Sequence, residues 1–217
     1  MKDSGICYWC GAPASSDEHV PPKNLFPKAK RKNLITVRSC SEHNEKLTKE
    51  DELFRFYIQA CSDSPESLKL FSDKTMRSFE RHEAAKLLDA IFKDSHPVWM
   101  TGGETRALKV SPERQQLYFE KIIRGLFFHI FGRRMNGTVA AASPSFIAPS
   151  LDYGALSNSL SKYFASPEAI EGQLEQPEIF RYRYYFHQNG GREGFAIRMI
   201  FYSSVVVLGL YTSTTRE

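Results

Sequence analysis

The chain carries the sequence CYWC at residues 7–10 and CSEHN at residues 40–44, and these two stretches decide how its first part folds. Each stretch places two metal-type donors with two residues between them, a spacing that lets both side chains reach one tetrahedral ion. In a chain with no export signal, a C-x-x-C pair is more typical of a metal or redox site than of a disulfide. A thioredoxin-like redox site requires a strand ahead of the pair, for which the six residues before Cys7 leave no room. The pattern therefore predicts zinc.

Three of the donors are cysteines, and either His43 or Cys61 can complete the set. His43 repeats the two-residue gap, whereas Cys61 falls on an apolar helical stretch and is expected to be a small buried hydrophobic residue. We therefore predict a closed, structural zinc site whose ligands are Cys7, Cys10, Cys40 and His43. A catalytic zinc would need an open coordination position, which makes a zinc hydrolase the least favoured interpretation.

Polar residues between and beside the two metal pairs indicate a second, hydrolytic site. Glu18 directly precedes His19, and a carboxylate beside an imidazole can hold a hard divalent ion while the imidazole takes a proton from water. Asn44 follows the last zinc ligand, so the zinc would fix its position and aim its amide oxygen back toward the strand that carries Glu18. One ion held by Glu18 and Asn44 would keep positions open for water and phosphate oxygens.

A basic segment follows His19. It contains no acidic residue, and on charge alone a solvated loop explains it as well as a binding surface does. Beside a hydrolytic site, it is expected to contact the phosphates of a nucleic acid. Its basic residues are Lys23, Lys28, Lys30, Arg31, Lys32 and Arg38.

Together, these residues resemble the HNH endonucleases of the ββα-metal fold, in the subgroup that carries a pair of zinc knuckles. The resemblance covers about residues 5–58 and rests on both knuckles, on EHVPPK at residues 18–23 and on NLITV at residues 33–37. It implies that His19 is the general base and that Asn33 braces the loop and orients His19. It also implies that Asn44 replaces the final motif histidine as a metal ligand. Glu18 stands where an aspartate is more common, and it keeps the carboxylate.

The implied reaction is metal-assisted hydrolysis of a phosphodiester, with Mg²⁺ or Mn²⁺ as the catalytic ion and zinc in a purely structural role. We expect the partner to be nucleic acid, with DNA favoured over RNA. The main alternative is a non-catalytic zinc module that docks nucleic acid or a protein. It explains the knuckles and the basic segment but not the other polar residues at matching spacing. By analogy, a small nuclease with an unfamiliar accessory region suits a phage, mobile-element or phage-defence setting.

The whole-chain composition indicates a globular protein. Hydrophobic residues make up 41% of the 217 residues and charged residues 25%, with a net charge of +4. The N-terminus lacks an apolar signal region, and the most apolar run, residues 203–211, is too short to span a bilayer. We therefore expect a cytoplasmic protein with no membrane partner. Residues 1–60 are expected to form the zinc-stabilised nuclease module and residues 61–217 an accessory region for target recognition, a protein partner or homo-oligomerisation.

The expected fold class is α+β, with the ββα-metal module followed by a helical region packed with a C-terminal antiparallel sheet. Serine caps and first-turn prolines predict helices that begin at Pro65 and Pro112, the second ending near Arg133. The His96-Pro97 pair and Gly102-Gly103 predict a break between helices. Aromatic residues alternate along residues 180–186, and Asn189-Gly190 is a hairpin signal.

Overall fold

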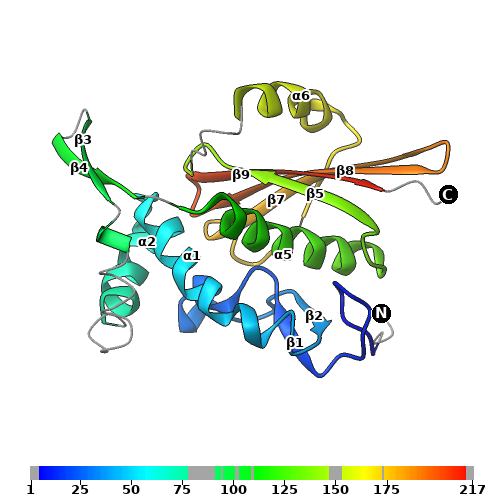
Figure 1. The fold of residues 1–217 in the computed structure, drawn as a ribbon, viewed down its shortest axis with the longest axis horizontal. Helices are drawn as coiled ribbons and strands as arrows, with labels where there is room; N and C mark the ends of the chain where they lie inside the picture. Colours follow the sequence, from blue (N-terminus) through cyan, green and yellow to red (C-terminus); the bar gives the residue numbers. More distant parts are fainter. Residues whose placement is uncertain are drawn as a thin grey trace.

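The computed structural model describes residues 5–77, 91–93, 95–100, 103–108, 110–146, 153–172 and 174–213. The protein is α+β, as the sequence predicts, and contains a helical region and a five-stranded antiparallel sheet. Helix α5, Pro112–Phe131, lies between the sheet and the N-terminal part of the chain, while helix α6, Tyr153–Ala165, lies on the other face of the sheet (Figure 1).

The N-terminal part folds as a short hairpin followed by a helix. Strand β1, Ser16–His19, pairs antiparallel with β2, Thr36–Ser39, and helix α1, Thr48–Ala60, follows a 3₁₀ turn at Glu45–Leu47. The loop between the strands contains two further 3₁₀ turns, Lys23–Leu25 and Lys28–Lys30. The β-branched run at residues 34–37 predicts a returning strand, and β2 begins two residues after the start of this run. Even so, Val20 N donates to Ile35 O at 2.9 Å, so the main chains already meet there.

Helix α5 has the limits that its sequence signals predict. The Ser111 side chain accepts a hydrogen bond from Arg114 N and caps the first turn, and Gly132 ends the helix with a φ of +67°. The helix approaches the end of β1 closely, because a Cβ placed on Gly125 would lie 2.5 Å from Val20 Cγ2. Glycine at this position therefore lets α5 pack directly against the N-terminal hairpin.

The C-terminal sheet has the strand order β5-β9-β8-β7-β6. Its strands are β5 Gly137–Ala142, β6 Ile170–Glu171, β7 Phe180–Asn189, β8 Arg192–Phe201 and β9 Val205–Ser213. The predicted hairpin at Asn189-Gly190 is present, and its two turn glycines have φ of +55° and +78°. Alternate residues of β7, led by the buried Phe180 and Tyr182, join the core that contains α5.

Beyond α1 the chain forms helix α2, Pro65–Leu70, capped by Ser64 as expected, and a π-helical turn, Phe71–Met76. The predicted break between helices is present, because residues 91–93 are helical and α5 begins at Pro112. An unexpected hairpin of β3, His96–Met100, and β4, Gly103–Ala107, fills the break. Pro97 is compatible with a two-stranded sheet, in which each strand has a free edge, and Gly103 adopts a φ of +111°. This hairpin projects from the molecule (Figure 1).

One hydrophobic core runs through both halves of the chain. The same cluster contains Tyr8 and Phe54 from the first 60 residues and Phe119, Phe127 and Phe201 from the remainder. The expected boundary at residue 60 therefore does not coincide with a gap in the core. None of the helices in the described ranges combines the length and apolarity needed to cross a bilayer.

Candidate metal centre and hydrolytic site

The four predicted zinc ligands lie together. Their donor atoms are all within 4.8 Å of one another, with Cys10 Sγ 3.8 Å from Cys40 Sγ and Cys40 Sγ 3.3 Å from His43 Nδ1. A tetrahedral zinc with bonds of about 2.0–2.3 Å separates its donors by about 3.5–3.8 Å. The group formed by Cys7, Cys10, Cys40 and His43 can therefore hold a metal ion such as zinc.

Main-chain hydrogen bonds shape the first knuckle for metal binding. Gly11 N donates to Cys7 O at 3.0 Å, and Tyr8 N donates to Arg38 O at 2.9 Å, which ties the knuckle to β2. Burial raises the pKa of the Cys7 thiol, while main-chain groups of Cys10, Cys40 and Trp9 lower it, and the net result is a pKa of about 7. The thiolate that a metal requires is therefore accessible near neutral pH.

Two side chains that are not metal ligands hold His43 in place. The Trp9 ring stacks on the His43 ring with centroids 4.8 Å apart, and the Arg124 guanidinium of α5 lies 5.4 Å from the Trp9 ring centre. Cys61 is outside the metal group. It is exposed at the end of α1, so the expectation that it is a buried hydrophobic residue is wrong. Its thiol instead points to Ser145 O, at 3.7 Å.

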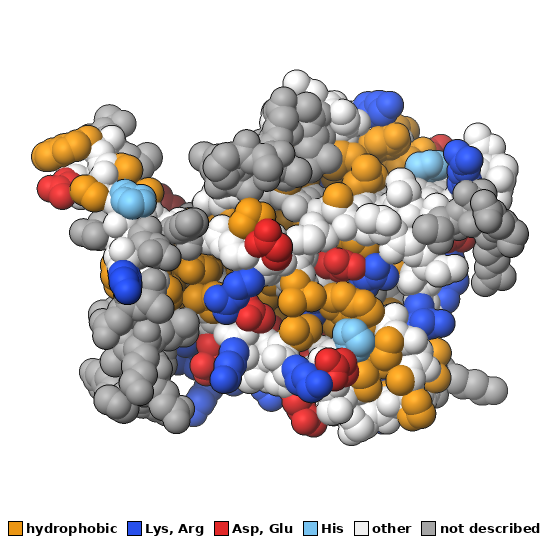
Figure 2. All heavy atoms as spheres, in the orientation of Figure 1, with side chains coloured by type: hydrophobic (Ala, Val, Ile, Leu, Met, Phe, Trp, Pro, Cys, Tyr) orange, Lys and Arg blue, Asp and Glu red, His pale blue; other side chains and the backbone are white. Residues whose placement is uncertain are grey.

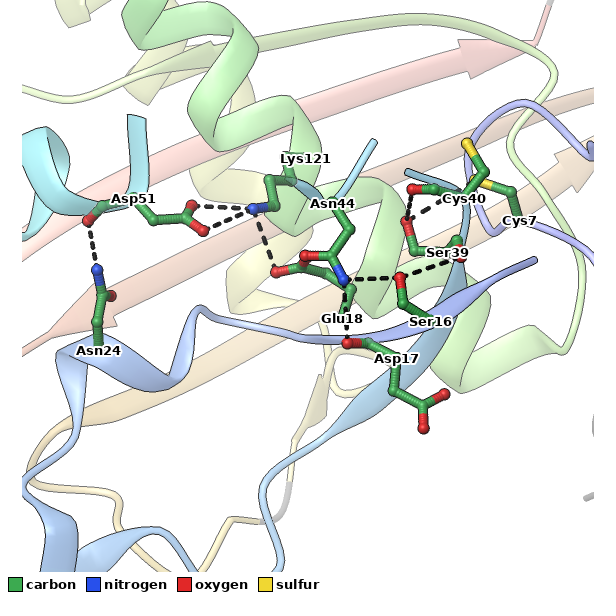
Figure 3. Close-up of polar contacts among 10 residues, drawn as sticks. All are labelled: Cys7, Ser16, Asp17, Glu18, Asn24, Ser39, Cys40, Asn44, Asp51 and Lys121. Carbon is green, nitrogen blue, oxygen red and sulfur yellow. Dashed lines mark hydrogen bonds and ion pairs between the residues drawn. The ribbon is translucent and has the colours of Figure 1, made fainter. Parts of the chain in front are cut away.

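A buried lysine dominates the hydrolytic site. Lys121 of α5 is 1% exposed, and its ammonium lies 3.1 Å from Glu18 Oε1 and 2.9 Å from Asp51 Oδ1 (Figure 3). Asp51 belongs to α1, so the ammonium joins three elements of the fold. The sequence provides one indirect signal for this role, because Lys121 interrupts the apolar stripe of an amphipathic helix.

Glu18 is less fully paired than the Lys121 contact suggests. Burial raises the pKa of the Glu18 carboxyl, Lys121 lowers it and Asp51 raises it, which leaves a pKa of about 7. Glu18 Oε2 is buried and has no hydrogen-bond partner. Burial likewise raises the pKa of Asp51, against the effect of Lys121. Two carboxylates thus share one ammonium, and the pocket keeps an excess of one negative charge when both are ionised.

His19 lies on the other face of the hairpin. Because successive strand residues alternate between faces, Glu18 and its buried partner Val37 face the core, whereas His19 shares its face with Asp17 and the exposed Thr36. Figure 3 shows the Asp17 side chain pointing away from Lys121. The pKa of His19 is lowered by burial and then by the charges of Lys23 and Arg31, although Asp17 raises it. The imidazole is therefore neutral at pH 7.

The two asparagines occupy different surroundings. Asn44 Nδ2 donates to Ser16 Oγ at 2.9 Å and to Asp17 O at 3.2 Å, which holds the side chain against β1 next to Glu18. Asn33 adopts a φ of +50° and donates to the Glu175 carboxylate. Within the described residues, no hydrogen bond links Asn33 to His19.

The basic segment is partly neutralised. Lys30 pairs with Glu178 at 2.6 Å, and Arg38 pairs with Asp17 at 2.9 Å, while Arg31 Nε donates to Phe26 O. Three lysines of this segment are exposed and form no ion pair with any described residue: Lys23, Lys28 and Lys32. On the visible face, basic and acidic side chains mix over the N-terminal part (Figure 2). This segment is therefore a mixed surface with a few free cations.

Comparisons with known proteins add no constraint to this geometry. The chain matches no family model, no curated protein and no solved structure. The function proposed below therefore rests on the arrangement of these residues.

Removal of the metal should destabilise the whole protein. A structural zinc contributes on the order of 10 kcal/mol, and the core that it supports is shared with α5. We expect the purified chain to contain one equivalent of zinc by atomic emission, and chelation to lower its unfolding midpoint. Cys40→Ser should lose the zinc, whereas Cys61→Ser should retain it. An unfolding curve that chelation leaves unchanged would contradict the structural role.

Replacement of Lys121 tests the buried ion pairs. Lys121→Met leaves two buried carboxylates without a cation and should cost about 3–5 kcal/mol in the free energy of urea unfolding. Lys69→Met removes an exposed lysine of α2 and should change the free energy of unfolding by less than about 0.5 kcal/mol. Adding Glu18→Gln and Asp51→Asn to Lys121→Met should recover part of the loss. A loss below about 1 kcal/mol for Lys121→Met would rule out the pairing.

Proposed function

We propose that the chain is a metal-dependent endonuclease of the HNH type that hydrolyses phosphodiester bonds, most readily in DNA. One observation carries the proposal. Two antiparallel strands precede a helix, His19 ends the first strand, and Asn44, next to a predicted zinc ligand, is bonded back onto that strand. This element order, with a histidine at the end of the first strand and an asparagine ahead of the helix, supports the resemblance to the ββα-metal module.

The catalytic ion would be held by Glu18 and Asn44 in this proposal. Glu18 supplies a buried oxygen, Oε2, that has no hydrogen-bond partner, and Asn44 has bonds from its amide nitrogen that leave its oxygen free among the described residues. Carboxylate and amide oxygens are the ligands that Mg²⁺ and Mn²⁺ prefer. The surplus negative charge around Lys121 also favours a cation. When bound, such an ion stabilises the charge that develops on the phosphate and the leaving oxygen.

His19 serves as the general base of the proposed reaction. Its neutral imidazole takes a proton from a water molecule, and the water attacks the phosphorus in line with the departing 3′ oxygen. Asp17 shares its face of β1 and can orient the ring or stabilise the imidazolium that forms. Lys23, Lys28 and Lys32 would contact the nucleic-acid backbone. The helical and β regions that follow would determine which target is cut.

Two contacts in the structure favour a non-catalytic zinc module instead. Lys121 already supplies a cation to Glu18, and Asn33 is bonded to Glu175 rather than to His19. In that second candidate function, the zinc-bound hairpin and the basic segment dock nucleic acid or a protein partner without cleavage. The two functions differ in whether His19 is needed for any measurable reaction.

Cleavage assays distinguish the two functions. Supercoiled DNA, linear DNA and RNA are incubated with the protein and Mg²⁺ or Mn²⁺, and products are resolved on gels. We expect cleavage by the wild type and a loss of about 10²–10⁴-fold in His19→Ala, since a general base contributes that much. His187→Ala changes an exposed histidine of β7 and should retain activity. Equal cleavage by wild type and His19→Ala, or none by the wild type on any substrate, would refute the nuclease.

Calorimetric titration with Mn²⁺, combined with the cleavage assay, locates the catalytic ion. Glu18→Gln should lower Mn²⁺ binding in calorimetry together with cleavage, whereas Asp17→Asn should retain Mn²⁺ binding. The reverse result would place the ion on the face of β1 that carries His19 and would contradict the assignment of Glu18.

The pH dependence of cleavage should reflect the environment of His19. Since burial and nearby cations lower its pKa, the acid limb of kcat/KM should have its midpoint below the ordinary histidine value of about 6.5. Lys23→Met removes one of these cations, so the fall should move to higher pH. Lys32→Met, in the same segment, should leave it in place. At saturating Mn²⁺, which keeps Glu18 ionised, an acid limb with its midpoint above about pH 6.5 in the wild type would contradict the assignment of His19 as the base.

A further inference from the structure

Three arginines gather on the face of the sheet that carries α6. Arg183 of β7 and Arg198 of β8 are directly opposite in the strand register, and Arg181 lies two residues from Arg183 on the same face. Like charges directly opposite each other destabilise a strand pair. An anion bound between them would remove this cost.

Two hollows meet at these arginines. One has a volume of 440 Å³ and extends under α6, and the other has a volume of 310 Å³ and extends toward β6. Arg183, Arg198 and Ile200 line both of them. Each volume falls within the range of about 300–1,000 Å³ typical of small-ligand pockets. The hollow under α6 also has an apolar wall, which includes Phe164 and Leu208.

The positive charge in these hollows is poorly balanced. Among the described residues, the ion pair of these arginines, from Arg183 Nη1 to Glu171 Oε1, is long at 3.6 Å, and Glu171 is 61% exposed. Arg183 Nη2 makes hydrogen bonds of 3.4 and 3.5 Å to main-chain oxygens, and its Nε is buried without a partner. Across the described ranges, Arg181 and Arg198 form no ion pair. Arg198 lies 5.7 Å from the centre of the Phe164 ring, a contact that holds its guanidinium beside the hollow.

We propose that this pocket binds a phosphate monoester, carried either by a free nucleotide or by the 5′ end of a nucleic-acid strand. Guanidinium groups bind phosphate through paired N–H donors, and two of them flank the shared part of the hollows. The apolar wall formed by Phe164 and Leu208 can accept the sugar or base that follows the phosphate. Because α5 and β1 lie on the opposite side of the sheet, this site is separate from His19 and stands whether or not the chain is a nuclease (Figure 1).

Calorimetric titration of the full chain tests the pocket. The probes are inorganic phosphate, a nucleoside 5′-monophosphate, and a short DNA strand with and without a 5′ phosphate. We expect saturable binding of at least one phosphomonoester probe, and weaker binding of the unphosphorylated strand than of its phosphorylated form. Tighter binding of the mononucleotide identifies a small ligand, and tighter binding of the phosphorylated strand identifies a strand end.

Matched variants assign the binding to the arginines. Arg198→Gln should weaken binding at least tenfold, and Arg198→Lys should weaken it less because it keeps the charge. Arg192→Gln removes an exposed arginine of the same strand outside the pocket and should have no effect. Circular dichroism confirms that each variant is folded, and His19→Ala should bind normally. Absence of binding to every phosphorylated probe, or equal binding by wild type and Arg198→Gln, would overturn the proposal.

Discussion

The buried ammonium of Lys121 is the interaction on which the rest of the site depends. A lysine with 1% exposure is tolerated because carboxylates from β1 and α1 lie beside it. These two buried ion pairs hold α5 against the N-terminal hairpin. Arg124 and Gly125 follow three and four residues later on the same face of α5. Arg124 supports the tryptophan that stacks on His43, and Gly125 admits Val20. One helix face thus supports both the metal group and the end of β1.

The alternation of β1 separates two kinds of chemistry. Its inner face carries a carboxylate whose charge is shared with a lysine, and its outer face carries an imidazole kept neutral by nearby cations. The predicted zinc stands apart from both, since its closed ligand set has no position for a reactant. An ion bound by the metal group would order the segment that leads to Asn44, whereas the two faces of β1 determine what the strand itself can bind.

Features encoded over a few residues were predictable from the sequence. The spacing of the cysteines and His43, the serine cap of α5, and the Asn189-Gly190 turn all follow from local chemistry. The partners of Glu18 and Asn33 were not predictable, because Lys121 and Glu175 come from distant parts of the chain. The hairpin of β3 and β4 was missed because proline and glycine break a helix and also suit a turn between edge strands. Local spacing identified the group that could hold a metal ion, whereas the tertiary contacts determined which charges meet.

The separation of Glu18 and Lys121 along the chain also sets a delay between the synthesis of the two residues. They are 103 residues apart (121 − 18), so at about 5–20 residues per second the ribosome makes Lys121 some 5–20 s after Glu18. The knuckle cysteines and His43 are complete much earlier, within the first 43 residues. The group that could hold a metal ion is thus complete in a nascent chain while the neighbouring carboxylates are still hydrated and unpaired. The folded arrangement around β1 is delayed until α5 has left the exit tunnel, so that an unfinished polypeptide lacks the assembled centre.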